Sequence, residues 1–412
     1  MKKRISRVGT AMFAVLAAAM LCVAAASART DRAAATTLRI WVDKDPKPAV
    51  EKVAGEWAAS RGVTLQVVEK GFGNIRSDLG TVDASQAPDV IFSASDWTGE
   101  LAANGLVLPL FPKKSVTKVF PKYALAAYTY KQLYGAPTAI ENIGLVVNTK
   151  LVKVPKTFAQ LEKEALAFKK RSGDNIAIAV PQGTGGDAYH MYPFFSGLCG
   201  YVFGTTKSGA LSPSKLGVAN KAFLRNAPII DKWNREGLIN SKVGYNDAKD
   251  AFLKGRAAFW VTGPWESDTL KSSGLNFRII QVPKIKCRSV PFLGVRGFMV
   301  TKYSATHGVQ SLAKDLVGRY MMGVPSQIQL AAANGRFPAN VNAGKRVSDG
   351  VLKQFGKAGV GGVPLPNIPQ MASVWSELGG AWVKATKGAG ATNARSAFTT
   401  AAKSIAKKIA SG

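Results

Sequence analysis

Acidic side chains follow two apolar, strand-like runs near the start of the chain. Asp43 and Asp45 come after the run 38–42, and Asp96 comes after the run 90–92. Ligands of parallel α/β sheets bind beyond the carboxyl ends of the strands, so these carboxylates are candidates for a binding site. An isolated aspartate after a strand can also form a turn or cap a helix, and this interpretation is preferred for Asp43.

Aromatic side chains stand at the ends of other predicted elements. Trp265 follows the turn Gly263-Pro264, and Trp375 follows the proline- and glycine-rich stretch 356–369. At such positions a tryptophan can face a cleft, whereas Trp41 and Trp57 fall within regular elements and are expected in the core. Planar aromatic faces and carboxylates together can pack on a ring and accept hydrogen bonds from hydroxyl groups.

The bulk composition indicates a globular, exported, strongly basic protein. A chain of 412 residues with 47% hydrophobic residues suits two domains rather than one core. Four basic residues, an apolar run and small residues at 26–28 predict a signal peptide over residues 1–28. Its removal would lower the formal charge of +30 by four. Lipid attachment at Cys22 is an alternative, against which the preceding Leu21 argues.

The charge and the cysteines leave several functions open and disfavour others. The basic residues are scattered, which favours a basic surface facing an anionic envelope over nucleic-acid recognition. Cys199 and Cys287 could pair in an oxidising compartment, but the sequence does not show that they meet. With two histidines and no metal-binding motif, we expect no metal site and no cofactor.

The elements that must hold these side chains alternate between strands and helices. Strands are predicted at 38–42, 63–67 and 90–92, with a helix through Val50, Val53 and Trp57 between the first two. This order predicts a parallel sheet with right-handed crossovers. The pattern restarts at 145–147, with a helix capped by Thr157, strands at 176–180 and 257–261, and mostly helix from Val309.

Five segments carry a resemblance to a known family. They contain Ile40-Trp41-Val42; Pro88-Asp89-Val90-Ile91-Phe92 with Asp96 and Asn104-Gly105-Leu106; Tyr134-Gly135 with Pro137, Glu141 and Asn148-Thr149-Lys150; Ala251-Phe252, Lys254-Gly255 and Gly263-Pro264-Trp265; and Pro366-Asn367-Ile368-Pro369-Gln370-Met371 with Trp375. Over essentially the whole mature chain, the sequence resembles extracellular solute-binding proteins of the maltose/maltodextrin-binding type, the receptors of ABC sugar importers.

The resemblance implies an α/β, two-lobe periplasmic-binding-protein fold, with a hinge that the chain crosses several times and a ligand cleft between the lobes. The N-lobe would comprise residues 36–140 and 298–348, and the C-lobe residues 142–290 and 350–410. The implied protein is an extracytoplasmic, monomeric, non-enzymatic receptor. It would bind a maltodextrin-like oligosaccharide and deliver it to ABC permease subunits, with no nucleic-acid partner.

The same resemblance assigns roles to individual residues. Carboxylates of Asp45, Asp96 and Glu141 would accept hydrogen bonds from sugar hydroxyls on the N-lobe and hinge side, and Asp187 and Tyr189 would contact them from the C-lobe. Tyr192, Trp265 and Trp375 match positions that stack on sugar faces, and for Tyr192 a place in the core is an equal alternative. His190 has no evident partner in the sequence.

Departures from the family pattern keep the identity of the sugar open. Ser93 replaces a tryptophan of the maltose binders, and Trp97 replaces an arginine, so the stacking surface has either moved to Trp97 or been reshaped for another glycan. Pro46 also replaces a lysine that contacts sugar hydroxyls, and Ser376 replaces a tyrosine. Cyclodextrin or another oligosaccharide is therefore an alternative ligand. An anionic-polymer binder and a two-carboxylate glycosidase are the competing functions.

Overall fold

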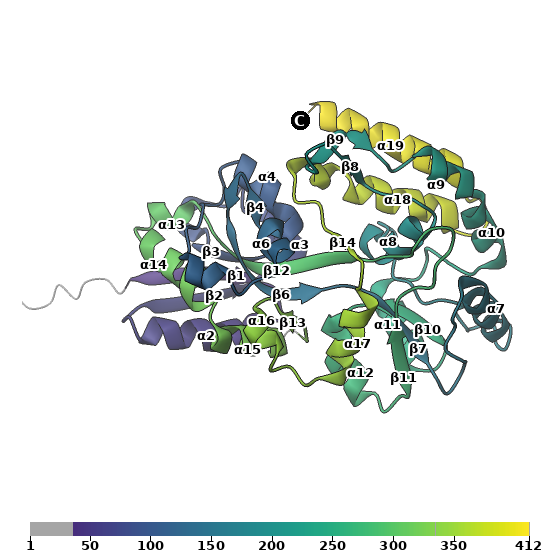
Figure 1. Ribbon diagram of the computed structural model, residues 1–412, viewed down its shortest axis with the longest axis horizontal. Coiled ribbons are helices and arrows are strands. Elements are labelled where there is room, and N and C mark those ends of the chain that lie inside the picture. The colour runs from purple at the N-terminus through teal and green to yellow at the C-terminus, as the bar shows by residue number, and fades with distance from the viewer. Residues whose placement is uncertain (1–35, 334, 412) are drawn as a thin grey trace, which may run out of the picture.

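The computed structural model describes residues 36–333 and 335–411. The predicted signal peptide 1–28 and Cys22 lie outside the described residues. The described chain forms two α/β lobes, which are joined by extended segments running between them (Figure 1). The α/β class predicted from the alternating pattern is confirmed. Among the described helices, none combines the length and the apolar character that crossing a membrane requires.

The N-lobe is built on one mixed sheet with the strand order β13-β6-β12-β3-β1-β2, in which β14 also pairs with β12. Strand β1 pairs in parallel with β2 and β3, as the strand–helix–strand pattern predicts, and β12 runs antiparallel to β3 and β6. The strands are β1 (Thr37–Val42), β2 (Thr64–Glu69), β3 (Val90–Ala94), β6 (Gly135–Glu141), β12 (Phe292–Val300), β13 (Phe337–Pro338) and β14 (Val363–Pro364), and a separate hairpin contains β4 (Thr129–Tyr130) and β5 (Gln132–Leu133).

Helices cover both faces of this sheet. Because side chains alternate along a strand, Ile40 of β1 packs into the cluster that contains α2, whereas Trp41 packs into the opposite cluster with α3 and α4. Burial on both faces explains why the strands read as continuous apolar runs. The N-lobe helices are α2 (Lys47–Ala59), α3 (Phe72–Asp78), α4 (Thr98–Ala103), α5 (Lys114–Thr117), α6 (Lys122–Ala127), α13 (Tyr303–Thr306), α14 (Gln310–Asp315), α15 (Val324–Ala333) and α16 (Val341–Gly344).

The C-lobe has a smaller sheet in which β7 lies between β10 and β11. Two hydrophobic clusters again flank the sheet, and helix α17 packs on one side and α18 and α19 on the other. Its elements are β7 (Gly144–Asn148), α7 (Phe158–Lys169), α8 (Ala188–Gly197), β8 (Phe203–Thr205), β9 (Leu211–Leu216), α9 (Lys221–Asn226), α10 (Pro228–Glu236), α11 (Tyr245–Leu253), β10 (Phe259–Thr262), α12 (Ser267–Ser272), β11 (Phe277–Ile280), α17 (Gly350–Ala358), α18 (Trp375–Thr386) and α19 (Ala394–Ser411).

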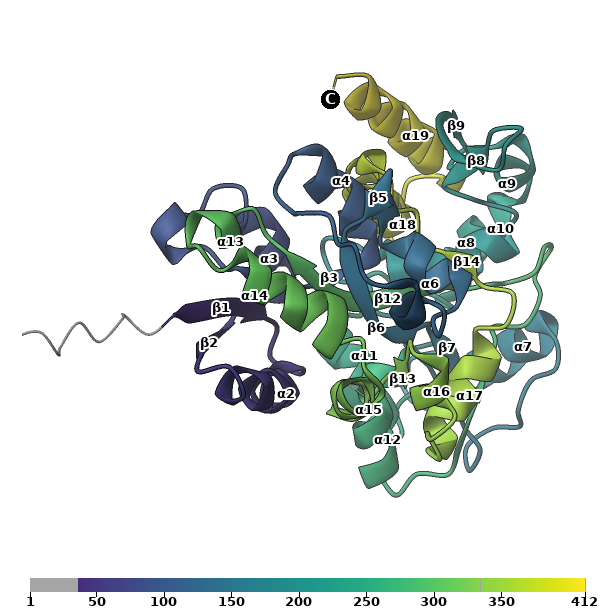
Figure 2. The same ribbon diagram turned by 60° about the vertical axis from the view of Figure 1, so that its left-hand side comes forward.

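The chain passes between the lobes at β6–β7, at the start of β12 and between α16 and α17; in Figure 2, α6, α16 and α17 lie along one side of this junction. The expected boundary at residue 298 falls inside β12, because the pairing of β12 with β6 already begins at Gly294. A disulfide joins Cys199, just after α8, to Cys287, in the loop before β12.

The predicted strand 176–180 is wrong in its extent. Only Ile176 and Ala179 form isolated bridges, to Ala257 and Trp260 respectively. Directly after Ala179 the backbone turns instead of continuing the ladder, with Val180 N donating to Ile178 O. Pro181 follows and lacks the donor that a longer ladder requires.

Candidate functional site

A cleft of about 510 Å³ lies between the lobes and is lined by side chains of both. The structure brings nearly all of the predicted site residues to it: Asp45, Asp96, Trp97, Glu141, Asp187, Tyr189, Trp265 and Trp375. The cleft also contains residues that the sequence analysis did not select: Asp43, Phe72, Arg76, His190, Arg296, Arg336 and Leu365. Five carboxylates and three arginines therefore share one concave surface.

Tyr192 is the predicted site residue that the structure does not bring into the cleft. Its side chain is 2% exposed and belongs to the hydrophobic core of the C-lobe. The ring stacks on Phe292 with a centroid separation of 3.5 Å. Of the two places considered for Tyr192, the core and the sugar-stacking surface, the structure shows the core, because that face of α8 packs inward against β12.

A hydrogen bond crosses the cleft between Trp375 and Asp96. The indole Nε1 of Trp375, at the start of α18 in the C-lobe, donates to Asp96 Oδ2 of the N-lobe at 3.0 Å. Asp96 follows β3 in the 3₁₀ turn Ser95–Trp97. Burial raises the pKa of the Asp96 carboxyl, although the charge of Arg76 and the hydrogen bond from Trp375 act in the opposite direction. The two lobes therefore already touch at the site.

Glu141 is held by a buried ion pair at the end of β6. Arg336, which precedes β13, donates from Nε to Glu141 Oε2, and its guanidinium carbon lies 5.5 Å from the ring centroid of Trp265 in the other lobe. Burial alone would raise the pKa of Glu141, but the charges of Arg336 and Arg296 outweigh it and hold this pKa below its ordinary value. Glu141 is therefore a fixed, ionised acceptor.

Arg296 forms a second ion pair on the floor of the cleft. It projects from the middle of β12 and contacts Asp43 Oδ2 at 3.3 Å. Its guanidinium carbon lies 4.0 Å from the ring centroid of Phe72 and 4.6 Å from that of Phe92. Asp43, interpreted from sequence as a turn or cap residue, thus also belongs to the site. A single arginine within the apolar run 292–300 is the signal that could have revealed Arg296, since a buried charge needs a partner.

Helix α8 brings Asp187, Tyr189 and His190 to the cleft. Asp187 caps the helix, because its Oδ1 accepts from His190 N at 2.9 Å, and its Oδ2 lies 2.6 Å from His190 Nδ1. Burial would raise the pKa of Asp187, but the charge and hydrogen bonds of His190 hold it below its ordinary value. Burial raises the pKa of Tyr189, so its hydroxyl stays protonated. The sequence analysis found no partner for His190, although an aspartate three residues before a histidine at a helix start is a signal that could have revealed the pair.

Two groups of aromatic rings border the polar side chains. Trp97 packs against Phe72 with ring centroids 4.7 Å apart, and Trp265 lies 6.3 Å from Tyr189. Ser93 is fully buried and donates to Gly297 O, so position 93 does not line the cleft. The aromatic surface on the N-lobe side is therefore provided by Trp97 and Phe72.

Several buried polar atoms of the cleft have no hydrogen-bond partner within the described chain: Asp43 Oδ1, Tyr189 Oη, His190 Nε2 and Arg296 Nε. Leaving such a group unpaired costs about 1–3 kcal/mol. Acceptors and donors occur together in this set, which matches a ligand carrying hydroxyl groups, since a hydroxyl both donates and accepts. Across residues 36–333 and 335–411, no group of three or more His, Cys, Asp or Glu side chains is placed to hold a metal ion.

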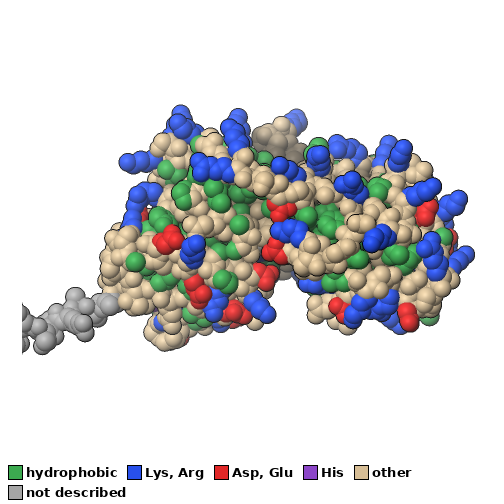
Figure 3. Space-filling model, turned by 90° about the horizontal axis from the view of Figure 1, so that it is seen from below, with side chains coloured by type: hydrophobic (Ala, Val, Ile, Leu, Met, Phe, Trp, Pro, Cys, Tyr) green, Lys and Arg blue, Asp and Glu red, His purple; other side chains and the backbone are tan. Residues whose placement is uncertain are grey.

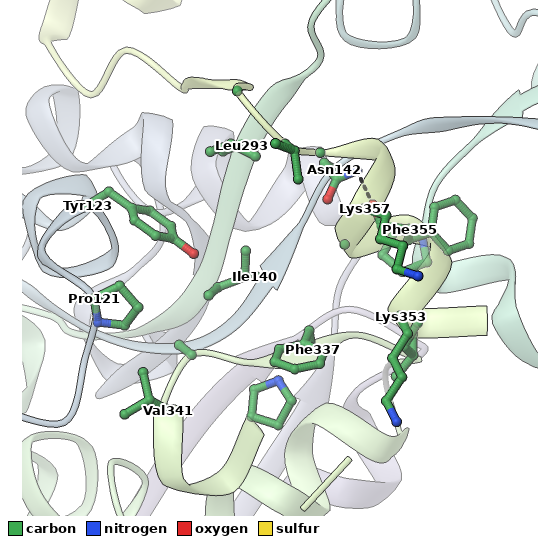
Figure 4. Close-up of a pocket in the computed structure, with 18 residues that line it drawn as sticks. Pro121, Tyr123, Ile140, Asn142, Leu293, Phe337, Val341, Lys353, Phe355 and Lys357 are labelled. Atoms are coloured by element: carbon green, nitrogen blue, oxygen red, sulfur yellow. Dashed lines mark hydrogen bonds between the residues drawn. The ribbon is translucent and has the colours of Figure 1, made fainter. Parts of the chain in front are cut away.

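A second cavity, of about 660 Å³, lies on the other side of the hinge strands (Figure 4). Ile140 and Asn142 line it, whereas Glu141 between them faces the cleft. Its walls are mostly apolar, with Val341 on one side and Lys353 and Lys357 of α17 on the other. We refer to it as the hinge groove. It contains no cluster of carboxylates, so the inter-lobe cleft is the better candidate site.

Two lobes around a cleft of hydrogen-bonding and aromatic side chains define a binding protein that closes on a small ligand. Residues 52–352 match the family of bacterial extracellular solute-binding proteins. The chain belongs to this family, as its sequence motifs predict, and it is an extracytoplasmic protein.

Individual relatives cover most of the chain. It is 26% identical to a galactooligosaccharide-binding protein of Bacillus subtilis over 89% of each chain. It is 28% identical to a maltodextrin-binding protein of the same organism over 88% of this chain and 89% of the relative.

Solved structures share the fold. A maltotriose-binding protein of Thermus thermophilus bound with maltotriose matches with a TM-score of 0.79 and 25% identity, over 90% of this chain and all of that one. A cyclo/maltodextrin-binding protein complexed with maltotetraose matches with a TM-score of 0.74 and 25% identity, over 91% of this chain and 97% of that one. The predicted two-lobe fold is thereby confirmed.

Proposed function

We propose that this protein binds a neutral oligosaccharide in the inter-lobe cleft and delivers it to the permease of an ABC importer. The observation that carries the proposal is the composition of the cleft. Carboxylates fixed by arginines and a histidine face aromatic rings, and unpaired buried donors and acceptors lie between them. Charge-assisted hydrogen bonds to hydroxyls and packing on the C–H faces of a sugar ring are the interactions such a surface offers.

The relatives support this ligand class. Their names describe receptors for galactooligosaccharides and maltodextrins, two of them belong to ABC transporters of maltooligosaccharides, and the solved neighbours hold maltotriose and maltotetraose. Maltodextrin-like oligosaccharides are therefore the first ligands to test. The altered aromatic positions 93 and 97 also make cyclodextrins and other glycans candidates.

Delivery requires that the ligand favour the closed arrangement of the lobes, because only differential affinity shifts a conformational equilibrium. The site supports such a mechanism, since Asp96, Glu141 and Arg336 come from one lobe and Trp265 and Trp375 from the other. A ligand that contacts both sets binds best when the lobes approach. The closed form would then be the one that the permease recognises.

The experiment that tests the proposal is calorimetry of the purified protein against maltotriose, maltotetraose, β-cyclodextrin and a galactooligosaccharide. We expect at least one of them to bind and to raise the melting temperature, since a ligand that binds only the folded state stabilises it. If the folded protein binds none of these carbohydrates, the proposal fails.

Chromatography after prolonged incubation with maltotriose tests the glycosidase alternative, and any turnover would establish catalysis.

The basic surface motivates the anionic-polymer alternative. Lysines and arginines are spread over both lobes on the face in Figure 3, where acidic side chains gather near the junction of the lobes. Binding of a polyanion weakens steeply with salt, whereas binding of a neutral sugar does not. Repeating the titration at about 50 mM and about 500 mM salt separates these functions. Sugar affinity should change less than twofold.

A further inference from the structure

The start of α8 presents two candidate ligand contacts, and the geometry separates their roles. Both carboxylate oxygens of Asp187 are engaged with His190, one with its backbone N at 2.9 Å and one with its ring Nδ1 at 2.6 Å. The side chain of Asp187 thus faces the helix start and the imidazole. His190 is 5% exposed, yet it lines the cleft.

The Asp187 carboxylate determines which ring nitrogen of His190 carries the proton. Burial would raise the pKa of Asp187, but the hydrogen bonds between its two oxygens and the backbone N and ring Nδ1 of His190 help to hold this pKa below its ordinary value, so Asp187 is ionised at neutral pH. An ionised carboxylate only accepts hydrogen bonds, so Nδ1 must donate to it. In the neutral imidazole, Nε2 is then the acceptor.

The surroundings of His190 hold its ring in place and leave Nε2 without a partner. The ring packs edge-on against Trp265 at 5.7 Å, Tyr245 at 6.2 Å and Tyr189 at 5.9 Å between centroids. Nε2 is buried and makes no hydrogen bond in the described structure, and the same holds for the hydroxyl of Tyr189 on the preceding residue. A fixed orientation with an unsatisfied acceptor is the expected arrangement for a group that awaits a donor from a ligand.

We infer that His190, and not Asp187, is the side chain of this pair that contacts the ligand. His190 Nε2 accepts a hydrogen bond from one sugar hydroxyl, and the hydroxyl of the adjacent Tyr189 forms a further hydrogen bond with the ligand. Asp187 is a positioning residue that fixes the ring of His190 and its tautomer. This inference rests on the proposed function and deepens it. It predicts specificity, because an acceptor at this position selects a free hydroxyl and rejects a ligand whose oxygen there is alkylated or missing.

The test uses calorimetry with the full chain and the tightest-binding oligosaccharide of the panel above, together with its monodeoxy analogues. His190→Phe keeps a ring but removes Nε2, and we expect it to weaken binding by about tenfold, as for the loss of one hydrogen bond. His190→Gln retains an acceptor and should stay within about threefold of the unmodified protein. For the unmodified protein, one monodeoxy analogue should bind about tenfold more weakly than the parent oligosaccharide. For His190→Phe, the same analogue should bind less than twofold more weakly than the parent.

Asp187→Asn distinguishes positioning from direct contact, because asparagine preserves the helix cap but not the fixed tautomer. As a single substitution, Asp187→Asn should weaken oligosaccharide binding. Added to His190→Phe, it should weaken binding no further. A double variant clearly weaker than His190→Phe would return the contact to Asp187 and overturn the inference. So would a folded His190→Phe protein that binds as tightly as the unmodified one, or the absence of any analogue with this dependence on His190. If the unmodified protein binds no oligosaccharide, the proposed function fails first and the inference fails with it.

Discussion

At the residue scale, the Glu141–Arg336 pair removes two charges from water where the lobes meet. Removing one partner of a buried pair leaves the other charge uncompensated, at a cost of about 3–5 kcal/mol. We therefore expect Glu141→Gln to lower the free energy of unfolding at pH 7 by about 3 kcal/mol in urea titrations. Glu51→Gln, which removes the exposed Lys47–Glu51 pair, is the matched control and should cost less than about 1 kcal/mol.

The contribution of the Glu141–Arg336 pair to the free energy of unfolding should decrease at acidic pH. The pKa of Glu141 is lower in the folded protein than its ordinary value of 4.5, so its stabilisation is fully present above that value. The stabilisation is lost as the pH falls through the lower folded-state pKa. The stability difference between the unmodified protein and Glu141→Gln should hence narrow below pH 4.5, which urea titrations across this range measure. A constant difference down to the acid unfolding limit would contradict the assigned ion pair.

Trp375 combines an aromatic face with the hydrogen bond to Asp96. Trp375→Ala removes both and should weaken oligosaccharide binding by about 10- to 100-fold in calorimetry. Trp375→Phe keeps a ring without the donor, so an intermediate loss is expected. Unchanged affinity in a folded Trp375→Ala protein would remove Trp375 from the ligand surface.

Sequence patterns found the site residues that stand at element ends and failed for those whose role depends on packing. Asp96 follows a strand and Trp375 follows a loop, so the order of elements marks each of them as a site candidate, whereas their contact across the cleft is known only from the structure. Tyr192 and His190 lie two residues apart on α8, and only the packing of that helix decides that Tyr192 points into the core and His190 toward the cleft. Arg296 was missed because its partner, Asp43, is distant in sequence.

At the element scale, the alternation of strands and helices was predictable because it rests on local patterns. The apolar runs 38–42 and 90–92 form β1 and β3, and the stripe through Val50, Val53 and Trp57 is the buried face of α2. The run 176–180 has the same composition but forms only isolated bridges, because pairing depends on the neighbouring segment and on the proline that follows. Residue composition does not encode the length of a ladder.

The Cys199–Cys287 disulfide ties the end of α8 to the loop before β12, across 88 residues of chain. Closing a loop of this size restricts the unfolded chain, and its loss costs about 2–4 kcal/mol. We expect the Cys199→Ser/Cys287→Ser variant to melt several degrees lower than the unmodified protein in calorimetric scans. A reducing agent should lower the melting temperature of the unmodified protein but not that of the variant.

At the scale of the whole molecule, the cleft and the hinge groove are coupled by the strands between them. Successive side chains of β6 face opposite sides, so Glu141 lines the cleft while Ile140 lines the hinge groove. A rotation of the lobes about these strands that narrows one cavity must widen the other. The Trp375–Asp96 contact across the cleft coincides with a hinge groove of about 660 Å³, as expected for lobes that have approached on the cleft side.

This coupling predicts that bulk added to the hinge groove strengthens binding in the cleft. Val341 is 42% exposed on the N-lobe side of the groove, opposite α17 (Figure 4). Val341→Trp places an indole against the apolar wall of the hinge groove and favours the arrangement in which this groove is open. Because the cleft is then closed, the variant should bind oligosaccharide about two- to fivefold more tightly, although residue 341 does not touch the ligand. Calorimetry measures the affinity, and small-angle scattering of the ligand-free protein should show a smaller radius of gyration.

The matched control is Val154→Trp, since Val154 is 38% exposed and lies outside both the cleft and the hinge groove. It adds the same side chain to the C-lobe surface and should leave the affinity unchanged. Equal effects of the two variants would mean that surface bulk acts nonspecifically. Weaker binding by Val341→Trp would mean that the groove closes together with the cleft, which requires a hinge axis outside β6 and β12.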